Sequence, residues 1–177
     1  ERGYLFYNKV QDIKIMQKKR IKIVFLSFTK NTGIAFQKNG KFISALNDDD
    51  NLKEFFINSH NSLINFANKN ENYELLIKPK WKGSEKEIIG NWYKFNNEKI
   101  KKNIVISSDL NFYEIIQDAN VIFAFGASSI LESGILNIPI VIPFFDEVKK
   151  YQEYFNLKEY RNSYIVWEDP KNLEFIK

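Results

Sequence analysis

The chain has 177 residues, of which 44% are hydrophobic and 16% aromatic, so one domain with a packed core is expected. It contains no cysteine, which excludes disulfides and thiolate zinc sites, and no apolar run reaches the roughly 18 residues of a membrane-spanning helix. The net charge of +4 is modest, and no basic and aromatic interleaving of an RNA-binding kind accompanies it, so no nucleic-acid partner is predicted.

Residues 1–20 are predicted to be an interdomain linker or edge segment. The chain opens without an initiator methionine and closes on NLEFIK, so we expect part of a longer polypeptide. The lack of cysteine fits a reducing compartment and no secretory signal stands at the N-terminus, so a cytoplasmic location is expected. The densest basic cluster is explained by a solvated linker or helix face. The alternative is a surface that attracts a polyanionic substrate or acidic lipid, the latter as peripheral association at the inner face of the membrane. This cluster comprises Lys14, Lys18, Lys19, Arg20 and Lys22.

The first predicted strand is Ile21–Thr29, a nearly continuous apolar run of the kind that is buried on both faces of a parallel sheet. Residues 30–40 are predicted to form a loop. A helix is predicted over 51–69, because its apolar residues recur with a period near 3.6 behind a run of three aspartates that suits a helix amino terminus. These apolar residues are Leu52, Phe55, Phe56, Leu63, Phe66 and Ala67.

The next strand is predicted at Tyr73–Ile77, followed by a helix that Ser84 and Glu87 open as a capping box. Ile88, Trp92 and Phe95 are expected on one face of that helix. A third strand is predicted at Ile104–Ser107, and Asp109 is predicted to cap the helix that follows it.

The last strands are predicted at Val121–Phe125, Ile138–Ile142 and Tyr164–Trp167, and Asp169-Pro170 is predicted to open a final helix. Strands thus alternate with helices from residue 21 onward. This pattern predicts an α/β, Rossmann-like parallel sheet with helices on both faces, whose ligand site lies at the carboxyl ends of the strands.

The segment 121–143 carries the strongest functional signal. The strand VIFAF leads into the small-residue turn Gly126-Ala127-Ser128-Ser129, and a short helix with Glu132 in its first turn follows. Backbone N–H groups and the positive end of the helix dipole converge at such a turn, which favours phosphate binding. The alternative is ordinary turn chemistry, with a serine as the N-cap and Ser129 and Glu132 as a capping box.

Three segments together resemble the C-terminal, nucleotide-sugar-binding domain of glycosyltransferases with the two-domain GT-B fold, above all those of bacterial surface-carbohydrate and capsule biosynthesis. They are IVFLSFT at 23–29, LLIKPKW at 75–81, and the stretch from NIVISSDL to NIPIVIP at 103–143. Non-hydrolysing UDP-sugar epimerases and the glycerophosphotransferases of wall teichoic acid share this architecture. The glycerophosphotransferase alternative is weakened, because Lys78-Pro79-Lys80-Trp81 stands where that motif is Lys-Pro-His-Pro.

The resemblance implies that residues 21–177 form a donor-binding domain, truncated at both ends, whose substrate is a UDP- or CMP-linked sugar. It implies no cofactor and no metal. The acceptor would be a glycan or a lipid-linked molecule, and the catalytic residues, which this sequence does not identify, are expected in a missing N-terminal domain. The fragment alone is therefore expected to be inactive as a transferase.

The resemblance also suggests roles for single residues. Glu132 would accept hydrogen bonds from the donor ribose, while Ser128, Ser129 and the backbone of Gly126 and Ala127 would hold the phosphates. Lys78 and Lys80 would neutralise the diphosphate, Thr29 would face the cleft, and Ser107 and Ser108 would support the base. Surface lysines and a polar loop are the alternatives for these last positions.

Three functions fit the sequence. The first is donor binding in sugar transfer to a glycan acceptor during surface polysaccharide biosynthesis. The second is a UDP-GlcNAc 2-epimerase-like enzyme, and the third is a non-catalytic α/β binding module. The single histidine, His60, is predicted to be structural, because it lies at the edge of an apolar helix stripe and has no second histidine to complete a metal site or triad.

Overall fold

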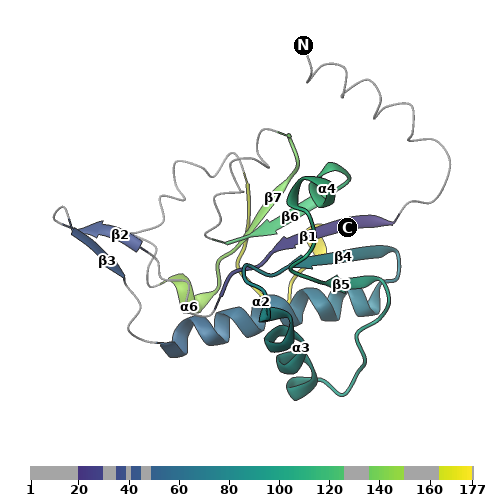
Figure 1. Ribbon diagram of the computed structural model, residues 1–177, viewed down its shortest axis with the longest axis horizontal. Coiled ribbons are helices and arrows are strands. Elements are labelled where there is room, and N and C mark those ends of the chain that lie inside the picture. The colour runs from purple at the N-terminus through teal and green to yellow at the C-terminus, as the bar shows by residue number, and fades with distance from the viewer. Residues whose placement is uncertain are drawn as a thin grey trace, which may run out of the picture.

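Six parallel strands form the central sheet of the computed structural model (Figure 1). The structure describes residues 20–29, 35–38, 41–44, 49–125, 136–149 and 164–176. The strands of the sheet are β1 (Ile21–Leu26), β4 (Tyr73–Lys78), β5 (Ile104–Ile106), β6 (Val121–Ala124), β7 (Ile140–Pro143) and β8 (Ile165–Trp167). Their order is β5-β4-β1-β6-β7-β8.

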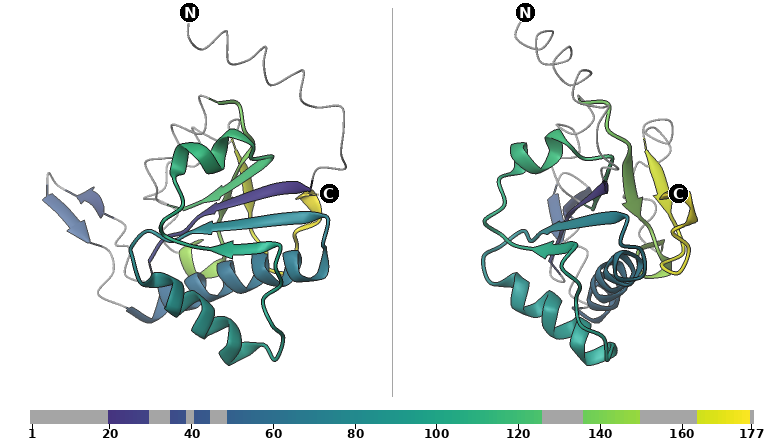
Figure 2. Two further views of the ribbon diagram at one scale, coloured as in Figure 1. Left: turned by 45° about the vertical axis from the view of Figure 1, so that its right-hand side comes forward. Right: turned by 90° about the vertical axis from the view of Figure 1, so that its right-hand side faces the viewer.

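Helices cover both faces of this sheet. They are α2 (Asp49–Lys69), α3 (Ser84–Phe95), α4 (Phe112–Gln117), α6 (Asp146–Lys149) and the short 3₁₀ turn η2 (Glu174–Ile176). Figures 1 and 2 show α2 and α3 against one face and α4 against the other. The predicted α/β, Rossmann-like architecture is therefore confirmed. In the parts of the chain that the structure describes, no helix combines the length and the apolarity that crossing a bilayer requires.

The alternation of side chains along β1 explains why its sequence is apolar throughout. Ile23 and Phe25 point into the larger core beneath α2 and α3, whereas Val24 and Leu26 point into a second cluster with Ile115 and Ile116 of α4. Successive residues of a strand face opposite sides of the sheet, so a strand covered on both sides needs apolar residues at every position.

Helix α2 begins within the predicted aspartate run and buries the predicted stripe against the sheet. Leu52, Phe55, Phe56, Leu63 and Ala67 are all buried, and Phe66 is partly buried. The 3.6-residue period therefore locates both the helix and its inner face correctly.

Both predicted cap residues of the shorter helices are wrong. Ser84 is the first helical residue rather than the N-cap, which is Gly83 at φ 92°, and the carboxylate of Glu85 accepts the Gly83 N–H at 2.8 Å. A capping box requires the serine one position earlier. For α4 the cap is Asn111, whose side-chain oxygen accepts the Tyr113 N–H at 3.0 Å, in place of Asp109.

Two further details of the elements differ from the prediction. In α3, Ile88 and Trp92 are buried as expected, but Phe95 in the last turn is 56% exposed. The predicted final helix is a turn around Asp169, whose side chain accepts the Lys171 N–H, and only η2 follows.

The predicted loop over 30–40 contains a strand, β2 (Ala35–Lys38), which pairs in antiparallel register with β3 (Lys41–Ser44). Lys38 pairs with Lys41, and Asn39-Gly40 stand between them in the sequence. An Asn-Gly pair between two short strands is a strong hairpin signal, which the prediction of a loop overlooked.

Candidate functional site

The order of the strands creates a switch point at the carboxyl edge of the sheet. From β1 the chain proceeds outward to β4 and β5, and then crosses to β6 on the other side of β1 before reaching β7 and β8. Connections therefore leave the neighbouring strands β1 and β6 in opposite directions. In open parallel sheets, ligands bind in the crevice outside the carboxyl ends of such a strand pair.

The ends of β1 and β6 are level at this edge, because Leu26 pairs with Ala124 in the parallel register. The chain continues from Ala124 through the buried Phe125 into residues 126–135. Gly126, Ala127, Ser128, Ser129 and Glu132 belong to that stretch, which lies outside the described residues. Their roles as phosphate and ribose ligands stay predictions, and the topology establishes only that their segment begins at the switch point.

A cluster of aromatic rings forms the floor beneath the switch point. Phe28 follows the end of β1 and is 1% exposed. Its ring lies 5.0 Å from that of Phe55 and 5.2 Å from that of Phe125, and the Phe55 ring is 5.3 Å from that of Phe145, all measured between centroids. The segments that leave β1, β6 and β7 are thereby packed onto α2, which gives the carboxyl edge a rigid base.

The only histidine is part of this floor. His60 is 1% exposed, and its Nε2 lies 2.8 Å from the Ser27 Oγ while its Nδ1 lies 2.7 Å from the Phe56 carbonyl oxygen. A carbonyl only accepts, so Nδ1 carries the proton and Nε2 accepts the Ser27 hydroxyl. Burial lowers the pKa of His60 to about 4, against the opposing effect of the hydrogen bond that its Nδ1–H donates to the Phe56 carbonyl oxygen. His60 is therefore a neutral structural residue, as predicted.

Lys78 binds the backbone of the loop that follows β5. Its ammonium group donates to the Ser108 carbonyl oxygen at 3.0 Å and to the Leu110 carbonyl oxygen at 2.5 Å. Lys78 ends β4 and is half-buried, so it lies at the carboxyl edge as predicted. Its predicted contact with the donor diphosphate stays a prediction, and it would compete with these two carbonyl groups for the same ammonium.

Glu85, in the first turn of α3, holds the same loop from its other side. Its Oε1 accepts the Ser108 N–H at 2.7 Å, and its Oε2 accepts the Gly83 N–H. Hydrogen bonds from Ser108 lower the pKa of Glu85 to about 2. Glu85 thus binds the backbone amide of Ser108, and Lys78 binds its carbonyl group. We call these two side chains the Ser108 clamp.

The Ser108 clamp leads to a testable result for Lys78. The Lys78→Met substitution is expected to lower the free energy of unfolding by about 1–3 kcal/mol, because it leaves half-buried carbonyl groups without their charged donor. Amide hydrogen exchange at Asp109–Asn111 should become faster. Lys80→Met is the matched control, since Lys80 is exposed, and it should change neither quantity. Equal effects of the two substitutions would contradict the clamp.

The other predicted residues lie along the same edge. Thr29 is half-buried and follows Phe28 directly, and Lys80 is exposed beyond the end of β4. Ser107 follows β5, with its N–H donated to the Ile77 carbonyl at 3.1 Å and its Oγ accepting the Asp109 N–H at 3.2 Å. The structure thus gathers Thr29, Lys78, Lys80, Ser107 and Ser108 at the edge that holds the switch point.

Sequence reasoning missed two residues here. Glu85 was overlooked because its partner Ser108 is 23 positions away, although a glutamate two residues after a glycine at a helix start is a visible signal. Trp81 is 62% exposed in the loop after β4, between Lys80 and Lys82. A tryptophan exposed in a polar loop at the carboxyl edge of the sheet offers a flat surface for stacking.

The sequence matches no protein-family model and no curated protein. Among solved structures, the chain is similar to the C-terminal CMP-Kdo binding domain of WaaA from Acinetobacter baumannii, with 12% identity and a TM-score of 0.52 over 98% of this chain and 87% of that one. It is also similar to the wall teichoic acid polymerase TagF, with 15% identity and a TM-score of 0.51 over 98% of this chain and 40% of that one.

A third structure, a putative UDP-N-acetylglucosamine 2-epimerase from Listeria monocytogenes, shares 12% identity with a TM-score of 0.47, over 76% of this chain and 31% of that one. At that score it bears on neither fold nor function. The first two likenesses extend over nearly the whole chain at low identity, so they speak for the fold alone. The chain therefore has the fold of the C-terminal, Rossmann-like half of GT-B proteins.

Proposed function

We propose that this chain is the donor-binding domain of a metal-independent GT-B glycosyltransferase, which transfers a sugar from a nucleotide donor to a glycan or lipid-linked acceptor in surface polysaccharide biosynthesis. The observation that carries the proposal is the switch point between β1 and β6. The glycine- and serine-containing segment that begins at Gly126 follows β6 at this point. The CMP-Kdo binding domain with the same fold supports a nucleotide-linked sugar as the ligand class.

In this proposal the chain acts by positioning and by electrostatic stabilisation of the departing nucleotide. Backbone N–H groups of 126–129, the hydroxyls of Ser128 and Ser129, and the exposed Lys80 would hold the diphosphate or phosphate. Glu132 would accept hydrogen bonds from the ribose hydroxyls. The Ser108 clamp would fix the loop on which the base rests, and Trp81 offers a ring against which the base could stack. An N-terminal partner domain would bind the acceptor and supply the general base, at the cytoplasmic face of the membrane.

Nucleotide binding by this chain tests the proposal. Isothermal titration with CMP and UDP, and with a sugar-linked form of each, is expected to give saturable binding to at least one pair. Glu132→Ala should weaken that binding by roughly 10- to 100-fold, since it removes charge-assisted hydrogen bonds to the ribose. Glu71→Ala is the matched control, because Glu71 lies at the opposite edge of the sheet, before β4. EDTA should leave the affinity unchanged.

Two outcomes would contradict the proposal. The absence of binding to every nucleotide would favour the alternative of a non-catalytic α/β module. Binding that Glu132→Ala leaves intact would remove the proposed ribose contact. No observation on the described residues favours the epimerase alternative over sugar transfer.

A further inference from the structure

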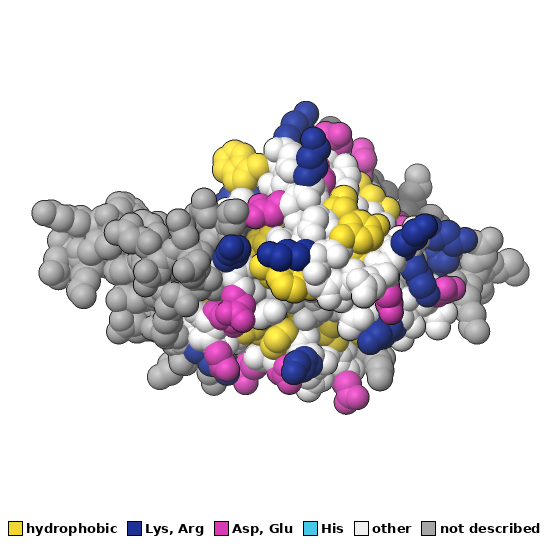
Figure 3. Space-filling view, turned by 90° about the horizontal axis from the view of Figure 1, so that it is seen from below, with side chains coloured by type: hydrophobic (Ala, Val, Ile, Leu, Met, Phe, Trp, Pro, Cys, Tyr) yellow, Lys and Arg dark blue, Asp and Glu magenta, His cyan; other side chains and the backbone are white. Residues whose placement is uncertain are grey.

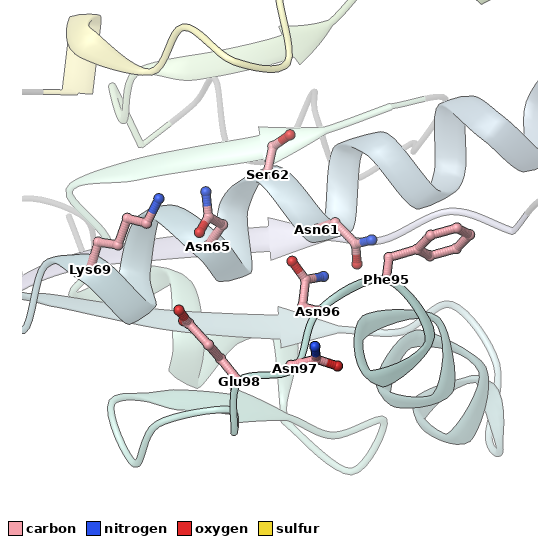
Figure 4. Close-up of a pocket in the computed structure, with 8 residues that line it drawn as sticks. All are labelled: Asn61, Ser62, Asn65, Lys69, Phe95, Asn96, Asn97 and Glu98. Atoms are coloured by element: carbon pink, nitrogen blue, oxygen red, sulfur yellow. The ribbon is translucent and has the colours of Figure 1, made fainter.

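A polar groove lies away from the switch point, between α2 and the segment that follows α3 (Figure 4). Its volume is about 570 Å³, within the range of small-molecule sites. One wall is a stripe of α2 with Asn61, Asn65 and Lys69 at four-residue spacing, and residues 95–98 form the other. Lys69 precedes β4 and Glu98 precedes β5, so the groove opens toward the amino edge of the sheet.

Within the described part of the chain, three of the four asparagine side chains that line this groove make no hydrogen bond to the protein, whereas the Asn96 amide donates to the Trp92 carbonyl oxygen at 3.1 Å. The Asn61 Oδ1 is buried without a hydrogen-bond partner, and the side chains of Asn65 and Asn97 have none either. Asparagines of α2 outside the groove behave differently. Asn58 donates to the Glu147 carboxylate at 2.8 Å, and Asn68 is bonded to the Lys99 carbonyl and the Lys101 N–H. Asn61, Asn65 and Asn97 therefore keep hydrogen-bonding capacity that the described part of the protein does not use.

These amides are the right chemistry for vicinal hydroxyl groups. Each asparagine side chain presents two donors and one acceptor oxygen, and each hydroxyl both donates and accepts. Figure 4 shows the Asn61 side chain beside Asn96 and Phe95. The Phe95 ring is 56% exposed at the mouth of the groove, where it provides a surface for the C–H face of a sugar ring.

The groove continues across α2 into a second hollow of about 260 Å³, because Ser62, Asn65 and Lys69 line both. Its far wall includes Lys171 and Glu174. The combined track therefore carries two lysines and two glutamates, counting Lys69 and Glu98 of the first groove. Figure 3, which views the molecule from the side of α2 and α3, shows basic and acidic side chains interspersed over the described residues. This balance of charge disfavours a polyanion and suits an uncharged ligand.

We propose that this track binds a neutral oligosaccharide, with the amides of Asn61 and Asn65 and the side-chain oxygen of Asn96 contacting its hydroxyls and Phe95 packing against a ring. The binding itself is independent of the donor site. Only the identification of the ligand with the glycan that the domain helps to extend rests on the proposed function.

Heteronuclear NMR of the ¹⁵N-labelled 177-residue chain tests this site. Maltotetraose and chitotetraose are titrated separately, and a heparin tetrasaccharide serves as the charged counterpart. At least one neutral oligosaccharide is expected to shift the side-chain amide signals of the groove asparagines saturably. The double substitution Asn61→Ala and Asn65→Ala should weaken that binding roughly tenfold or more, as expected for the loss of two hydrogen bonds.

A stability measurement separates a binding role from a structural one. Because Asn61 leaves a buried acceptor unmet, Asn61→Ala is expected to keep or raise the unfolding midpoint while it weakens binding. Asn91→Ala, on α3 outside the groove, is the matched control and should leave binding unchanged. The proposal is overturned if neither neutral oligosaccharide shifts the groove signals, or if only the heparin fragment does. Titration with CMP and UDP in the same samples reports on the donor site separately.

Discussion

Replacing Phe28 by alanine is expected to lower the free energy of unfolding by about 3–5 kcal/mol, the usual effect of truncating a buried phenylalanine. The ring is 1% exposed, stacks on Phe55 at 5.0 Å, and meets Phe56 edge-on at 5.7 Å. Neighbouring rings cannot fill the resulting cavity without leaving their own contacts with α2 and the strand ends. Urea unfolding followed by circular dichroism measures the change.

Tyr113→Ala is the control for Phe28→Ala, because that aromatic side chain is 64% exposed on α4. It is expected to change the free energy of unfolding by less than about 0.5 kcal/mol. A Phe28 variant as stable as the control would mean that the aromatic floor does not hold the switch point. If Phe28→Ala also weakens nucleotide binding under conditions where it stays folded, the floor supports the site as well as the fold.

The second large effect is a loss of stability in mild acid through His60. Its pKa is about 4 in the folded chain, lowered from 6.5 by burial. Below pH 6.5, His60 binds a proton in the unfolded state but stays neutral in the folded state. The free energy of unfolding therefore falls as the pH is lowered. The contribution of neutral His60 to the free energy of unfolding is complete above pH 6.5 and is lost as the pH falls toward 4. Between pH 7 and pH 5 the free energy of unfolding should fall by about 2 kcal/mol from this group alone.

The test is the slope of stability against pH in urea unfolding. His60→Asn keeps a side-chain N–H but cannot titrate, so its curve should be nearly flat between pH 7 and pH 5, although the variant is less stable throughout. Carboxyl groups contribute mainly below this range. An identical slope in the variant and the parent chain would show that the proton is taken up elsewhere.

The elements that sequence reasoning located are those in which one physical signal dominates. The run at Ile23–Leu26 requires burial on both faces, and the period of α2 requires one buried stripe, so both follow from hydrophobic pattern alone. The residues at which the helices begin were harder to predict from the sequence. Ser84 and Asp109 are suitable cap residues, yet Gly83 and Asn111 occupy the cap positions, since backbone geometry selects the cap one or two residues away.

The candidate site divides in the same way. Sequence order alone indicates that Thr29, Lys78 and Ser107 come to one edge, because parallel strands place their carboxyl ends together. What Lys78 binds was not accessible, because its partners lie 30 and 32 residues away and are backbone carbonyls, which carry no sequence signature. The groove that Asn61 lines was missed for a related reason, because the sequence does not show whether an asparagine side chain is hydrogen-bonded in the folded chain.

The outermost strands, β5 and β8, have three residues each, and one of their sides has no neighbouring strand among the described residues. A foreign strand docking there would gain only a few main-chain hydrogen bonds, which is too little to offset the entropy of ordering it. The short outer strands of the sheet therefore protect it against extension into fibrils.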